Sequence, residues 1–273
     1  MKLHELSATA LVEGYARRAF SPLEVMRDVI ARVKAYEPHI AATYLFAPER
    51  ALAEAELSTA RWAKGEPKGP LDGVPVTIKD NIATKGEPKP VGTAAVDLVA
   101  QPEDAPPAAR LREAGAIAFA KTTMPDYGML SSGLSSFHKL ARNPWDLSKG
   151  PGGSSAGAVA AGAAGYGPLH LGTDIGGSVR LPAGWCGLVG LKPSAGLIPI
   201  DPPYIGRVAG PLTRTVDDAA LMMATLSLPD ARDYTSLPAQ ARDWRVAPGP
   251  VKGKRIGLVL DIGCGAPADP DVA

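Results

Sequence analysis

Two stretches of glycine and serine lie in the middle of the sequence. KGPGGSSAGAVAAG covers residues 149–162, and GTDIGGSVR follows at residues 172–180. Such small side chains bury little apolar surface, so packing alone does not account for these runs. Glycine-rich loops either bind phosphate through bare backbone N–H groups or present a nucleophile beside donors for a developing negative charge.

The sequence lacks the residues that usually accompany a phosphate-binding glycine loop. A P-loop ends in a lysine followed by serine or threonine, and GPGGSSAGA contains no lysine. TDIGGSV does not have the spacing of a dinucleotide-binding GxGxxG motif. The sequence therefore favours a serine nucleophile, with Ser178 in a tight turn whose N–H groups can converge on its hydroxyl.

A nucleophilic serine needs a base for its proton. None of the four histidines lies in a glycine-rich turn, and His170 alternates with two leucines, as a structural histidine on a strand does. Lys79 ends the apolar run VPVTI (74–78), where burial would lower its pKa and let the neutral amine accept a proton. The pattern alone leaves open that Lys79 is a surface lysine at the end of a strand.

The order of the motifs resembles the amidase signature family from about residue 20 onward. The similarity is carried by GVPVTIKDN, GAIAFAKTTMPDYG, RNPWD, GPGGSSAGA and LGTDIGGSVRLPAGWCGLVGLKPS. It implies amide hydrolysis by a Ser–cis-Ser–Lys triad through an acyl-enzyme. Ser178 would be the nucleophile, Ser154 the bridging serine on a cis peptide bond, and Lys79 the base. Backbone N–H groups of Ile175, Gly176, Gly177 and Ser178 would form the oxyanion hole.

Four further residues are expected to support the triad. Ser155 either hydrogen-bonds within the site or caps the helix that follows it. Thr173 either orients Ser178 or simply ends its strand. Asp174 and Arg180 flank the nucleophile, and we expect them to pair and to fix the turn.

The substrate pocket is less well marked. Met124 and Tyr127, in MPDYG, are expected to line the acyl pocket. Cys186 is expected to be a small buried residue. Aliphatic, aromatic and peptide-terminal amides all remain possible substrates.

Two departures from the family pattern lie in the motifs themselves. Ala156 gives GGSSAG where relatives commonly have GGSSGG. Leu181 stands where the A subunits of tRNA-dependent amidotransferases typically carry Gln, and those subunits tend to have SDTGGS in place of TDIGGS. Leu181 and the TDIGGS motif favour a free-standing amidase that hydrolyses a small carboxamide to a carboxylate and ammonia or an amine. The alternative within the family is the glutaminase (A) subunit of such an amidotransferase.

Length is the third departure. Family members continue well past residue 273, so the sequence predicts a C-terminally truncated fold. The missing segment, or a homo-oligomer, would cover the apolar surface left open. An inactive fragment that only binds or associates is therefore the alternative of another class, although Lys79, Ser154 and Ser178 are all present.

The elements around these motifs alternate between helix and strand. Helices are predicted over 7–18, 21–36, 48–64, 105–114, 155–164 and 215–226, with a short one from residue 178; strands are predicted over 74–78, 116–121, 169–173, 187–192 and 254–260. Ser21 and Glu24 form a capping box at the clearest helix. The pattern indicates an α/β fold with a mixed central β-sheet covered by helices on both faces. An N-terminal helical region (1–70) and an α/β core (71–273) are expected to form one domain.

The composition is that of an ordinary soluble protein. The chain has 45% hydrophobic and 21% charged residues and a formal net charge of +1, which gives no reason to expect nucleic acid or an anionic membrane. Cys186 and Cys264 match no metal-ligand spacing and suit a reducing compartment. No signal peptide or spanning run is recognisable. We expect a cytoplasmic protein that binds a small-molecule amide and needs neither metal nor organic cofactor.

Overall fold

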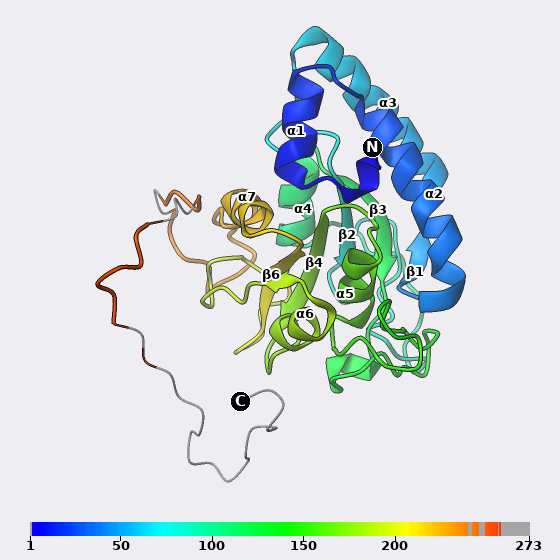
Figure 1. Cartoon of the computed structure of the whole chain (residues 1–273). Helices are drawn as coiled ribbons and strands as arrows, with labels where there is room; N and C mark the ends of the chain where they lie inside the picture. Colours follow the sequence, from blue (N-terminus) through cyan, green and yellow to red (C-terminus); the bar gives the residue numbers. More distant parts are fainter. Residues whose placement is uncertain (1, 240–241, 246–248, 256, 258–273) are drawn as a thin grey trace.

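A twisted, mixed β-sheet lies at the centre of the protein. Figure 1 shows the computed structural model, which describes residues 2–239, 242–245, 249–255 and 257. In this part of the chain the sheet has six strands in the order β1-β3-β2-β4-β6-β5. Their bounds are β1 (Thr43–Phe46), β2 (Pro75–Lys79), β3 (Ile117–Thr122), β4 (Leu169–Asp174), β5 (Val189–Gly190) and β6 (Val208–Thr213). β2 pairs in parallel with β3 and β4, whereas β1, β6 and β5 join antiparallel.

Helices cover both faces of this sheet. They are α1 (Ala8–Ala16), α2 (Pro22–Ile40), α3 (Pro48–Lys64), α4 (Pro106–Glu113), α5 (Ala156–Ala163), α6 (Arg180–Cys186) and α7 (Val216–Leu226), with 3₁₀ turns at Leu3–Glu5 and Asp126–Gly128. α4 joins β2 to β3, and α5 leads back from β3 across β2 to β4. Because right-handed crossovers in opposite directions lie on opposite faces, α4 and α5 flank the sheet from two sides (Figure 1). The expected α/β class is confirmed.

The best-marked helices begin where the sequence predicts. Ser21 caps α2 by accepting from the Glu24 N–H, and Glu24 accepts from the Ser21 N–H at 2.8 Å. Thr215 caps α7 in the same way, accepting from the Asp218 N–H at 3.1 Å. α2 runs on to Ile40, four residues beyond the predicted end, with Pro38 inside its last turn.

Two strands were not predicted. β1 is only four residues long, and β6 contains Gly210 and Pro211 within VAGPLT. The strand predicted over 187–192 is shorter, at Val189–Gly190. Of the strand predicted over 254–260, residues 256 and 258–260 lie outside the described residues, and residues 254, 255 and 257 are not in a strand.

The N-terminal region is joined to the rest of the molecule. β1 is an edge strand of the central sheet through its pairing with β3. The Arg32 side chain donates to the Ala164 carbonyl at 2.7 Å, and the Thr9 N–H donates to the buried Asp218 carboxylate at 3.1 Å. Within the described ranges, none of the helices combines the length and the apolar run that crossing a bilayer requires.

Candidate active site

Lys79 is the last residue of β2, and its side chain is completely buried. Its Nζ donates to Ser154 Oγ at 2.8 Å, to Ser155 Oγ at 3.0 Å and to Thr173 Oγ1 at 3.0 Å. The alternative of a surface lysine is therefore excluded. Three hydroxyl groups from two separate segments meet at one amine.

The buried position changes the proton affinity of this amine. Burial lowers the pKa of Lys79 to about 7, against the carboxylates of Asp80 and Asp174, which raise it, while the Arg207 guanidinium lowers it further. A large fraction of Lys79 is then neutral at neutral pH and can accept a proton.

The two serine stretches lie side by side. The Ser155 N–H donates to the Ser178 carbonyl at 3.1 Å, and the Gly153–Ser154 peptide bond is cis. Ser154 is buried and Ser178 half-buried, and both line a cavity of about 370 Å³. In the described part of the chain, Ser178 Oγ makes no hydrogen bond, so the Ser178 hydroxyl remains free to face a substrate.

The turn that carries Ser178 is built around Asp174. This carboxylate accepts from the backbone N–H groups of Gly177 at 2.8 Å and Val179 at 3.0 Å, and from two nitrogens of Arg180 at 3.0 Å each. Burial alone would raise the pKa of Asp174, but the Arg180 guanidinium and the backbone donors hold it at about 2. The expected pairing of Asp174 with Arg180 is present and fixes the turn.

This turn changes the set of candidate oxyanion donors. The Gly177 N–H points to the Asp174 carboxylate and is already occupied, contrary to its expected place in the oxyanion hole. The N–H groups of Ile175, Gly176 and Ser178 have no hydrogen-bond partner among the described residues. Three amides therefore remain open for a substrate oxygen.

The hydroxyl groups of Ser155 and Thr173 hydrogen-bond to Lys79 and make no contact with the Ser178 hydroxyl among the described residues. Ser155 makes no capping bond to α5; its Oγ accepts from Lys79 and donates to the Thr173 carbonyl at 3.2 Å. Thr173 Oγ1 accepts from Lys79 and from Asn81 Nδ2, both at 3.0 Å. Together they hold the amine in place.

The cavity differs in part from the expected pocket. Tyr127 lines it, whereas Met124 is fully buried in the loop that follows β3 and is not among the residues that line this cavity. The other lining residues are Asn81, Val91, Gly128, Met129, Thr173, Ile175, Tyr204 and Arg207. Asn81 stands two residues after Lys79 in the same motif and could have been identified; Tyr204 and Arg207 carry no local signal.

The two buried histidines nearest the site, His170 and His138, make structural contacts. His170 is buried and contacts Thr77 Oγ1 at 2.8 Å and the Gly167 carbonyl at 3.2 Å; burial lowers the pKa of His170 to about 3, so it stays neutral. His138 Nε2 lies 2.7 Å from the Asp80 carboxylate. Among the residues that the structure describes, no three His, Cys, Asp or Glu side chains gather to hold a metal ion. Cys186 is buried, as expected.

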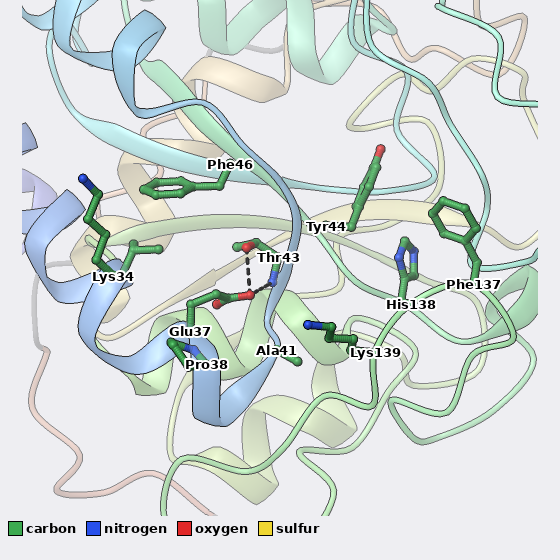
Figure 2. Close-up of a pocket in the computed structure, with 11 residues that line it drawn as sticks. Lys34, Glu37, Pro38, Ala41, Thr43, Tyr44, Phe46, Phe137, His138 and Lys139 are labelled. Atoms are coloured by element: carbon green, nitrogen blue, oxygen red, sulfur yellow. Dashed lines mark hydrogen bonds between the residues drawn. The ribbon is translucent and has the colours of Figure 1, made fainter.

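A larger hollow, of about 620 Å³, lies elsewhere (Figure 2). It is bordered by the end of α2, by β1 and by residues 137–139, and it shares no lining residue with the cavity of Ser178. Glu37 at its base accepts from the Thr43 N–H at 2.7 Å and the Thr43 hydroxyl at 2.8 Å. No serine of the described ranges lines this hollow, so the smaller cavity is the candidate active site.

Comparisons with known proteins point to one family. The family model described as "Amidase" matches residues 24–273. The glutamyl-tRNA(Gln) amidotransferase A subunit of Alkaliphilus metalliredigens is 38% identical over 268 residues, which are 94% of this chain and 54% of the relative. Its counterpart in Moorella thermoacetica is 39% identical and is matched over 57% of its length.

Solved structures share the fold as well. A bacterial aryl acylamidase of the amidase signature family superposes with a TM-score of 0.83 and 33% identity, over 89% of this chain and 51% of that one. The peptide amidase of Stenotrophomonas maltophilia gives 0.81 and 30%, over 88% and 52%. The chain spans about half the length of the proteins it matches. From its motifs, its fold and these similarities, it belongs to the amidase signature family.

Proposed function

We propose that this chain carries the catalytic centre of a free-standing amidase, with Ser178 as nucleophile and a small carboxamide as substrate. The observation that carries the proposal is the buried Lys79 amine, 2.8 Å from Ser154 Oγ, behind the cavity that Ser178 lines. A lysine is buried at high cost unless its neutral form is used.

The first half of the reaction forms an acyl-enzyme. Ser178 Oγ attacks the amide carbon and passes its proton to Ser154 Oγ, which passes its own proton to neutral Lys79. Ser178 Oγ must approach Ser154 Oγ for this transfer, and such contacts often tighten only when substrate binds. The carbonyl oxygen becomes an oxyanion, which the free N–H groups of Ile175, Gly176 and Ser178 stabilise.

The second half releases the product. The proton returns from Lys79 through Ser154 to the leaving nitrogen as the C–N bond breaks, and ammonia or an amine departs. Water then attacks the acyl carbon, gives its proton to the same path, and frees the carboxylic acid and Ser178.

A second function within the family has its own support. The relatives from Alkaliphilus and Moorella, at 38% and 39% identity, are amidotransferase A subunits. Leu181 and the TDIGGS motif argue for the free-standing enzyme. Release of ammonia from glutamine only in the presence of partner subunits would favour the amidotransferase instead.

The deciding experiment is labelling of the protein by a fluorophosphonate, which reacts only with an activated serine. We expect one label per chain at Ser178, lost in Ser178→Ala and strongly reduced in Lys79→Ala, with circular dichroism showing that both variants fold. A folded wild-type chain that takes no label would contradict the proposal and would indicate an inactive, binding fragment.

A further inference from the structure

Arg207 lies opposite the turn that carries Ser178. β6 begins at Val208, which pairs with Asp174, so the register places Arg207 across from Ile175. The preceding residue confirms this proximity, because a Cβ atom built on Gly206 would lie 3.5 Å from Ile175 Cγ1. The backbone of Arg207 is therefore next to a candidate oxyanion donor.

The side chain of Arg207 lies on the catalytic face of the sheet. Ala209 pairs with Thr173, and side chains two residues apart on a strand share a face. Arg207 is thus on the same face as Thr173, whose hydroxyl contacts Lys79. Consistently, Arg207 lines the same cavity as Ser154 and Ser178.

Among the residues that the structure describes, none provides a counter-ion to the guanidinium of Arg207. It donates to the Pro202 carbonyl at 2.7 Å and lies 5.7 Å from the centre of the Tyr204 ring. Within the described ranges no carboxylate lies within ion-pair distance of it; the Asp201 charge acts on it only from further away. Arg207 is half-buried, and burial lowers the pKa of its guanidinium against the charge of Asp201, which raises it.

The other charges near the cavity are already engaged. The Asp174 carboxylate is held by Arg180, and the Asp80 carboxylate contacts His138. Among the described residues that line the cavity, Arg207 is the one charged side chain. An arginine has five donors in a planar fork and so suits a carboxylate.

We propose that Arg207 forms an anion subsite of the catalytic cavity and that the amide substrate carries a carboxylate group. This inference rests on the proposed amidase function and specifies its substrate class. A substrate with a free ammonium group would be repelled by the same guanidinium. The cavity, at about 370 Å³, is in the range of small-ligand sites.

The test compares two amides of the same length with the whole chain at pH 8. Succinamate ends in a carboxylate, and butanamide ends in a methyl group. We expect kcat/KM to be about 10- to 100-fold higher for succinamate, as for the loss of a charge-assisted hydrogen bond. Arg207→Leu should bring the ratio of kcat/KM for succinamate to that for butanamide near one. Arg207→Lys should keep part of the preference for succinamate.

This ratio of kcat/KM values reports the subsite separately from the catalytic step, because both amides react through the same serine and lysine. Arg27, exposed on α2, provides the control: Arg27→Leu should leave the ratio unchanged. Labelling by the fluorophosphonate gives a second readout that needs no turnover. Succinate should slow the labelling of wild type and should not slow that of Arg207→Leu.

The outcomes separate the two proposals. If both amides are hydrolysed equally, or the preference survives in Arg207→Leu, the subsite is overturned while the amidase function stands. If Ser178 is labelled but neither amide reacts and succinate does not slow labelling, the subsite is again overturned. If Ser178 is never labelled and no amide reacts, the proposed function fails and the subsite falls with it.

Discussion

The environment of Lys79 determines how it can act as a base. In the described part of the chain its Nζ contacts three hydroxyls and no carboxylate within ion-pair distance. Hydroxyl oxygens accept from an ammonium and also donate to a neutral amine, so the same contacts serve both protonation states. A carboxylate in contact would instead have kept Lys79 charged.

This environment predicts the pH dependence of the enzyme. Because burial lowers the pKa of Lys79 to about 7 and the neutral amine is the active form, kcat/KM for butanamide should rise with pH up to about 7 and level off above it. Arg207 lowers the pKa of Lys79, so Arg207→Leu should move the rising limb to higher pH. The measurement is a pH profile of kcat/KM from pH 5 to pH 10.

A second buried lysine provides the control for this profile. Lys121 is nearly as buried, donates to the Ile82 carbonyl, and has its pKa lowered to about 8 by burial. It does not line the cavity of Ser178. Lys121→Met should therefore leave the rising part of the kcat/KM profile near pH 7. If this rise moves in Lys121→Met and does not move in Arg207→Leu, the titrating group is not Lys79.

At the scale of the elements, α5 brings the bridging serine to Lys79 by lying very close to the sheet. Its sequence is AGAVAAGA, and every residue from Ala156 to Gly162 is buried. A Cβ atom at Gly157 would lie 2.1 Å from the Ala42 carbonyl oxygen and 2.4 Å from the Thr123 backbone nitrogen. Both are backbone atoms, so they cannot move aside as a flexible side chain can.

Gly157→Ala should therefore push α5 away from the sheet. We expect the free energy of unfolding to fall by about 1–3 kcal/mol and the fluorophosphonate reaction to slow, since Ser154 and Ser155 precede the helix directly. Gly184 in α6 is the matched control, because a Cβ atom there meets nothing within 4 Å. Gly184→Ala should be neutral or slightly stabilising; equal losses in both variants would argue against the close approach.

The turn between β4 and α6 depends on one carboxylate. Asp174→Ala would leave the Gly177 and Val179 N–H groups and the Arg180 guanidinium without their acceptor. The expected loss is about 3 kcal/mol, seen as a melting temperature lower by roughly 6–12 °C. Asp243 pairs with Arg245 on the surface, and Asp243→Ala should leave the melting temperature unchanged. A similar melting temperature for both variants would contradict this role of Asp174.

Local patterns predicted the elements whose signals are themselves local. Ser21 with Glu24, and Thr215 with Asp218, mark helix starts because the capping partners lie three residues apart. β6 was missed because Pro211 argues against a central strand. The Pro211 carbonyl accepts from the Leu191 N–H, on the side of β6 that faces β5. In an antiparallel strand the nitrogen and the carbonyl of one residue point to the same neighbouring strand. The missing N–H therefore faces β5, away from β4, and costs β4 no ladder bond.

The residues of the candidate site also differ in whether a local sequence pattern predicts them. Lys79, Ser154 and Ser178 lie in motifs that can be recognised in sequence, and the structure brings them to one cavity. Arg207 could not be predicted, because it reaches the cavity only through the register of β6 on β4. That register depends on pairing between segments more than thirty residues apart.

At the scale of the whole molecule, residues 1–70 share their core with the rest of the described chain. Buried side chains of α1 and α2, such as Leu11 and Val29, belong to the same apolar cluster as Ile78 of β2 and Met223 of α7. Arg214 adds polar ties by donating to the carbonyls of His4 and Leu6. A boundary at residue 70 would separate β1 from its own sheet.

We therefore expect the N-terminal region to unfold together with the core, and not before it. Trp62 in α3 is the one tryptophan of residues 1–70, and the others are Trp145, Trp185 and Trp244. A variant with these three changed to Phe would keep Trp62 as its one fluorescent tryptophan, which lies in the N-terminal region and donates to the Asp72 carbonyl at 3.1 Å. Its urea midpoint should coincide with that of the far-ultraviolet circular dichroism, which follows all helices and strands. An earlier fluorescence midpoint would instead mean that residues 1–70 fold as a separate unit, and that β1 can leave the sheet while the Lys79 site stays intact.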